Sequence, residues 1–178
     1  MSAIEHRAGD FDQEQATKKA TTVMVKACLL DSVPWVGFSM IADYKDKGGR
    51  QKGETLEFDV NAGPFDLSFE LDDQSGLKLD FYPTFAESMW VAVGEKCPLG
   101  PGNGEGAITD GKKDEKKNKK IIMTNGNSDS QTLTFMLRFS GNVKDAAHPP
   151  YEYDPKIING ANPPLIEVDD DGPREEED

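Results

Sequence analysis

Apolar and polar residues alternate almost without error in three successive runs in the middle of this chain. The runs are Leu56–Val60, Phe65–Leu71 and Leu77–Tyr82. Successive side chains of a β-strand point to opposite faces, so a period of two places one face of each strand in a core and the other in water. Turn residues at 61–64 and 72–76 separate the runs. Because turns this short favour antiparallel neighbours, the pattern predicts three adjacent antiparallel strands.

The rest of the chain carries the same kind of signal, and helical periodicity is nearly absent. A chain of 178 residues typically forms one domain, and it can bury roughly 70% of its unfolded surface. We therefore expect an all-β fold, an antiparallel β-sandwich of immunoglobulin-like or jelly-roll type with about nine strands. A closed barrel is the alternative. Further strands are expected at 21–30, 35–43, 88–94, 121–124, 132–140 and 151–158.

Composition divides the chain into a body and two tails. Residues 1–19 are polar and predict a flexible N-terminal arm, and residues 20–160 form the single sandwich domain. Glycine, proline and lysine are concentrated at 95–120, which predicts one long loop. Residues 161–178 are rich in proline and then acidic, with eight acids against one arginine from 167 onward, so we expect a disordered tail.

The formal net charge of −13 limits the classes of partner. An acidic body repels nucleic-acid phosphate and anionic membrane surfaces, so we expect neither as a partner. The two cysteines form no CxxC pair, no apolar segment resembles a secretory leader, and no run approaches a membrane span. These features predict a cytoplasmic protein with reduced thiols.

Catalytic motifs are missing, and we expect no enzyme and no cofactor or metal. A Cys97–His148 pair would be a nucleophile and its base, but a cysteine near a strand end usually serves as a small apolar residue. Asp59 and Asp66 could pair as glycosidase carboxylates, yet a small sandwich rarely builds the cleft that this chemistry needs. The run Asn125–Asp129 resembles the start of a calcium loop. The twelfth position of such a loop requires glutamate and here holds Met136.

The binding candidates are the outward side chains of the alternating strands and the two tryptophans. The outward carboxylates could hold a cation or meet a basic partner, or they could form an ordinary solvated face. Exposed tryptophans could stack on sugars, whereas packing or a subunit interface would also explain them. The candidate residues are Glu57, Asp59, Asp66, Glu70, Asp80, Trp35 and Trp90.

Surplus apolar positions on the strands point to assembly. Met24, Leu30, Trp35, Ile41 and Trp90 fall off the main alternating faces and would bury against a second subunit. We therefore expect a non-catalytic sandwich that acts by binding a protein or a ligand and that self-associates. The alternative is a carbohydrate- or cation-binding module that uses the acidic strand face and the tryptophans. A small hydrolase is the remaining candidate.

One short segment resembles a known family. The run Tyr151-Glu152-Tyr153-Asp154-Pro155 resembles the C-terminal strand of small bacterial inclusion-body proteins, which have a sandwich fold. The resemblance covers five residues and carries no site, so it implies nothing about function and does not assign the chain to that family.

Overall fold

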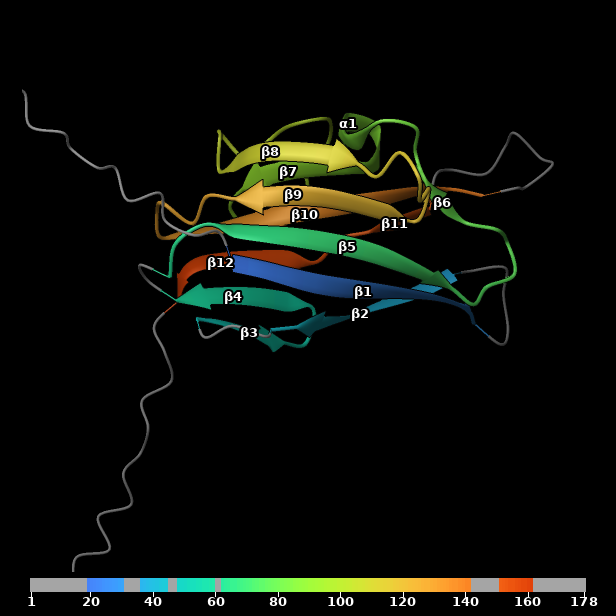
Figure 1. The fold of residues 1–178 in the computed structure, drawn as a ribbon, viewed down its shortest axis with the longest axis horizontal. Helices are drawn as coiled ribbons and strands as arrows, with labels where there is room; N and C mark the ends of the chain where they lie inside the picture. Colours follow the sequence, from blue (N-terminus) through green and yellow to red (C-terminus); the bar gives the residue numbers. More distant parts are fainter. Residues whose placement is uncertain (1–18, 31–35, 45–47, 60–61, 142–150, 162–178) are drawn as a thin grey trace, which may run out of the picture.

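Two β-sheets packed face to face form the body of the protein, which confirms the predicted all-β sandwich (Figure 1). The computed structural model describes residues 19–30, 36–44, 48–59, 62–141 and 151–161. The predicted arm and tail lie outside these residues, except that Lys19 and Ala161 belong to strands. Trp35 and His148 also lie outside them.

The first sheet, which we call the β5 sheet, has the strand order β2-β1-β5-β9-β8. The second, the β10 sheet, has the order β11-β10-β12-β4-β3, and β6 and β7 also pair with β10. In Figure 1, β9, β5 and β1 lie in front of β10 and β12. The elements are β1 (Lys19–Leu29), β2 (Val36–Asp43), β3 (Gly49–Lys52), β4 (Thr55–Asp59), β5 (Phe65–Asp73), β6 (Asp80–Phe81), α1 (Phe85–Ser88), β7 (Met89–Val93), β8 (Ile108–Lys113), β9 (Lys120–Asn125), β10 (Gln131–Ser140), β11 (Tyr151–Tyr153) and β12 (Lys156–Ala161).

The core lies between the inner faces of the two sheets, where the alternating pattern placed it. Phe58, Leu67, Leu79 and Phe135 are fully buried. Aromatic rings connect the sheets: Phe69 of the β5 sheet meets Phe135 of the β10 sheet edge to face, with 5.4 Å between ring centroids. Burial of these side chains supplies most of the driving force for folding, because each large apolar group contributes about 1.5 to 3 kcal/mol.

The predicted pairing of the alternating runs is wrong. β4 and β5 follow one another in the chain, but β4 belongs to the β10 sheet and β5 to the β5 sheet. The segment between them crosses from one sheet to the other instead of forming a hairpin. Two pairings are also parallel, β1 with β5 and β12 with β4, so the sandwich is not wholly antiparallel.

Two further predictions about local structure need correction. In the third alternating run only Asp80–Phe81 is a strand, and Lys78 has a φ of 54°, which breaks the extended backbone. The expected long loop at 95–120 contains β8, which pairs antiparallel with β9. Most side chains of β8 are exposed. An exposed edge strand carries no apolar alternation, so the sequence pattern missed it.

A buried pair of amides joins the two sheets within a mostly apolar interior. The Nδ2 of Asn125, on β9, donates to Oδ1 of Asn159, on β12, at 2.7 Å, and Nδ2 of Asn159 donates back to Oδ1 of Asn125 at 3.0 Å. Both side chains are buried. Asn127, in the left-handed conformation at φ 47°, extends the contact by donating to the carbonyls of Asp59 and Gly63 beside the crossover. The run that resembled a calcium loop therefore links the sheets.

The two amides of this pair should be energetically coupled, because removing one leaves the other buried without a partner. Asn159→Ala leaves the Asn125 amide buried without its partner, so we expect the free energy of unfolding to fall by about 1 to 3 kcal/mol. The double variant Asn125→Ala/Asn159→Ala should cost less than the sum of the two single variants. Urea unfolding followed by tryptophan fluorescence measures this, with the exposed Asn118→Ala as control. Strict additivity of the two single changes would contradict the coupling.

Candidate functional site

The outward acids of β4 are neutralised by one arginine. Arg50, on the neighbouring strand β3, reaches Oε2 of Glu57 with Nε at 2.6 Å and Oδ1 of Asp59 with Nη1 at 2.6 Å. All three side chains are less than a third exposed. An arginine that bridges two carboxylates satisfies the charges that a bound cation would need. Glu57 and Asp59 therefore bind Arg50 within the protein and are not arranged to bind a cation.

The outward acids of β5 lie on the other sheet and have partners of their own. Thr124 Oγ1 donates to Oδ1 of Asp66 at 2.6 Å, and Lys120 Nζ lies 2.8 Å from Oε1 of Glu70. The β4 and β5 acids face outward as predicted, but they lie on opposite sides of the molecule. The predicted continuous acidic face does not exist, because the chain crosses between the sheets after β4.

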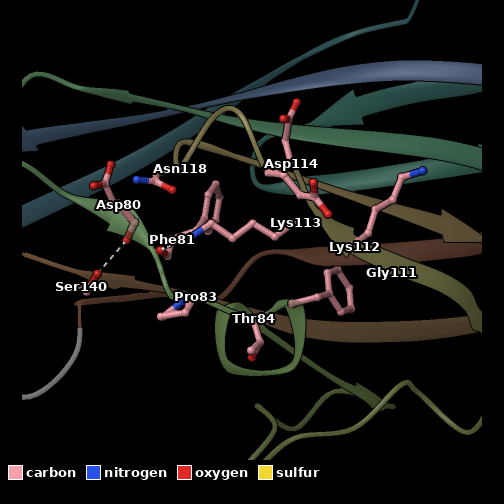
Figure 2. A pocket seen from close by; sticks show the side chains of 12 residues that line it. Asp80, Phe81, Pro83, Thr84, Gly111, Lys112, Lys113, Asp114, Asn118 and Ser140 are labelled. Atoms are coloured by element: carbon pink, nitrogen blue, oxygen red, sulfur yellow. Dashed lines mark hydrogen bonds between the residues drawn. The ribbon is translucent and has the colours of Figure 1, made fainter.

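Asp80 lies apart from the other acids, at the rim of an open cavity of about 770 Å³ (Figure 2). The cavity lies between β6, α1 and β8. Lys113 Nζ donates to the Phe81 carbonyl at 3.1 Å, and Ser140 Oγ donates to the Asp80 carbonyl at 3.3 Å. Phe85 rests against the backbone of Gly111, where a Cβ would lie within 2.3 Å of its ring. The lining residues are Asp80, Phe81, Pro83, Thr84, Phe85, Gly111, Lys112, Lys113, Asp114, Glu115, Asn118 and Ser140.

The charges around this cavity have both signs. Asp80, Asp114 and Glu115 are opposed by Lys112 and Lys113. The volume is within the range of small-molecule sites, roughly 300–1,000 Å³. Such sites are usually lined mainly by apolar groups, however, and this rim is mostly polar. The cavity selects no particular charge of ligand.

Arg138 covers one ring face of Trp90, which a sugar would otherwise stack on. Its indole Nε1 donates to the Ala86 carbonyl at 3.0 Å, and the guanidinium carbon of Arg138 lies 4.0 Å from its ring centroid. Arg138 also lies over Tyr82, at 5.1 Å, and its Nε is 3.1 Å from Oε1 of Glu152. This cation–π contact occupies the platform that the sequence suggested for a ligand.

Cys97 is a poor nucleophile in its surroundings. Burial, and then the nearby carboxylates of Asp154 and Glu152, raise the pKa of the Cys97 thiol above its usual range. The reactive form of cysteine is the thiolate, so a raised pKa suppresses reactivity at neutral pH. Both Cys97 and Cys28 are free thiols. Among the described residues, no group of three or more His, Cys, Asp or Glu side chains could hold a metal ion.

A different surface, at the edge of the β5 sheet, gathers apolar side chains in contact with water. Met24 of β1 and Ile41 of β2 are cross-strand partners, and they are 38% and 73% exposed. Leu30, the residue directly after β1, is 52% exposed and lies over Gly37. Met24, Leu30 and Ile41, which we call the apolar edge residues, are three of the five positions that the sequence marked for assembly.

Gln51 of β3 contacts the same edge, and the sequence gave no sign of this role. Its Nε2 donates to the Met40 carbonyl at 2.8 Å, and its Oε1 accepts from the Ala42 N–H at 2.7 Å. The side-chain amide thus takes the place that the backbone of a neighbouring strand would occupy. Gln51 lies in a polar stretch of the sequence, where a glutamine carries no distinguishing pattern.

No protein-family description matches this chain, and no curated protein matches it. The solved structure of the inclusion body protein PixA from Burkholderia cenocepacia J2315 is similar over 82% of this chain and 97% of that chain. The TM-score is 0.45 and the sequence identity is 9%. We draw no statement about function from this similarity. Within the described ranges, no helix has the length and apolar character needed to cross a lipid bilayer.

The raised pKa of Cys97 predicts that its thiol reacts with alkylating agents only at a higher pH than an ordinary thiol does. In a Cys28→Ser variant, the rate of Cys97 alkylation by iodoacetamide should rise with pH through a higher midpoint than that of free glutathione. The sign follows because burial and the carboxylates stabilise the neutral thiol. Asp154→Asn removes one of the carboxylates and should lower the midpoint. A midpoint at or below that of glutathione would show that the thiolate is stabilised instead.

Proposed function

We propose that this chain is a non-catalytic cytoplasmic β-sandwich that acts by protein binding, and that its partner is a second copy of itself. The observation that carries the proposal is the edge of the β5 sheet, where the apolar edge residues Met24, Leu30 and Ile41 lie exposed beside the terminal strand β2. Exposed apolar side chains along a sheet edge favour association with another polypeptide.

The other candidate features support this choice by being occupied within the protein. Arg50 and Lys120 neutralise three of the predicted acids, and Arg138 covers Trp90. The surroundings of Cys97 disfavour its thiolate. These residues stabilise the sandwich, each surface ion pair by roughly 0.2 to 1 kcal/mol. In the part of the chain that the structure describes, no comparable contact covers Ile41, which stays exposed at the edge of the β5 sheet.

Self-association should be measurable as mass and should depend on Ile41. We expect size-exclusion chromatography with light scattering to give a mass above that of the monomer. Ile41→Lys should weaken association by about tenfold or more, because a charge replaces an interface anchor. Thr22→Lys is the matched control, since Thr22 is also exposed but lies on the inner strand β1, opposite the polar Asp43. A wild-type monomer at every protein concentration would contradict the proposal.

The open cavity beside Asp80 supports a second candidate function, the binding of a small ligand. A ligand held there should raise the melting temperature in a panel of calcium, sugars and nucleotides, because binding to the folded state stabilises it. Asp80→Ala should abolish such a shift, whereas Asp129→Ala, at an exposed turn, should retain it. If no compound in the panel raises the melting temperature, this second function is excluded for those ligands.

A further inference from the structure

Half of the outer edge of β2 is available to another strand. β2 is the last strand of the β5 sheet and pairs with β1 alone among the described strands. The N–H and C=O of one residue in a strand point to the same side, and the bonds to Gln51 show that those of Met40 and Ala42 point away from β1. The backbone groups of Val36 and Phe38 therefore point outward as well.

Gln51 covers only the C-terminal half of this edge. Its amide engages the Met40 carbonyl and the Ala42 N–H, and β3 lies beside that end of β2 (Figure 1). No hydrogen-bond partner among the described residues faces the N–H and C=O of Val36 and Phe38 or the N–H of Met40. Among the described residues, no strand pairs with β2 on this side. A buried or shielded backbone group needs a hydrogen-bond partner, and an extended strand supplies one at the right spacing.

We propose that this open stretch, Val36–Met40, pairs with the same stretch of a second copy, antiparallel about a two-fold axis at Phe38. The inference rests on the proposed function and specifies its interface. In this register the N–H and C=O of Phe38 bond to those of Phe38 in the second copy. The N–H of each Met40 bonds to the Val36 carbonyl of the other copy. The pairing leaves the bonds made by Gln51 in place.

Charge and shape favour a second copy over an unrelated strand. The open stretch reads Val-Gly-Phe-Ser-Met and has no charged side chain, so two copies of an acidic chain can approach there without like charges in contact. Natural edges that avoid association usually carry lysine, proline or another charge. The stretch is also self-complementary, because one copy offers the donors that the other copy accepts.

The same register brings the apolar edge residues of two copies together. Leu30 lies over Gly37, with Leu30 Cδ2 2.9 Å from the position that a Cβ of Gly37 would take. Gly37 then faces Ser39 of the second copy, and Ile41 of the second copy lies on the diagonal, within reach of a long side chain. The pairing thus covers Leu30 and Ile41, both exposed in the single chain.

Disulfide trapping tests this register. In a background of Cys28→Ser and Cys97→Ser, the single variants Gly37→Cys and Ser39→Cys are prepared with different tags and oxidised separately and as a mixture. Residues 37 and 39 face one another as a pair without backbone bonds, with about 4.5 Å between Cα atoms. This separation is within the range of about 4.4 to 6.8 Å that a disulfide spans. Gly37→Cys displaces only the tip of the half-exposed Leu30.

We expect the cross-linked dimer in the mixture and far less of it with either variant alone. In the proposed register residue 37 of one copy faces residue 39 of the other, so two cysteines at the same position lie two residues apart along the paired strands. Ser68→Cys, which faces outward on β5 away from the edge, is the control that should not cross-link with Gly37→Cys. Cross-linking of Ser39→Cys alone would overturn the register. Light scattering that shows a dimer without any cross-link would overturn this interface but leave self-association standing. A monomer in light scattering would overturn both.

Discussion

The paired amides of Asn125 and Asn159 form a directional contact between the two sheets, in an interior that is mostly apolar. Apolar side chains such as Phe58 and Phe135 hold the sheets together without fixing their relative position, because hydrophobic burial has no direction. Two amides that satisfy each other have a single good geometry, and a slip of either sheet would leave both unsatisfied in the core. The amide pair therefore holds the ends of β9 and β12 in place relative to each other. Asn127 adds hydrogen bonds to the backbone on both sides of the connection from β4 to β5.

This crossover separates what the sequence could predict from what it could not. Alternation identified the inner faces correctly, because a period of two is a local property of an extended chain, and Leu67 and Phe58 are buried as expected. The sheet to which each strand belongs is a non-local property. The connection of residues 60–64 is short enough for a hairpin, and it is also long enough to pass from one sheet to the other. The predicted pairing was therefore wrong because it rested on the length of the connection alone. β8 was not predicted because its side chains are mostly exposed and show no apolar alternation.

The same distinction applies to the site. Glu57, Asp66 and Glu70 point outward as their strands predicted, but grouping them into one face required knowledge of strand order. The basic partners of Glu57 and Glu70, Arg50 and Lys120, come from neighbouring strands that no spacing rule connects to them. By contrast, Met24 and Ile41 were identified by falling on the wrong face of an alternating strand, which is a local signal, and the structure brings them side by side. Gln51 had no such signal, since its role depends entirely on where β3 meets β2.

Gln51 also limits how far any assembly through β2 can extend. An uncovered edge strand of full length would accept neighbours in several registers, and such freedom is the route to open-ended fibres. A side-chain amide that blocks one half of the edge leaves room for a single short contact, which the proposed pairing of two copies would occupy. In the proposed assembly, a single glutamine in a four-residue strand would stop growth through this edge at a closed pair.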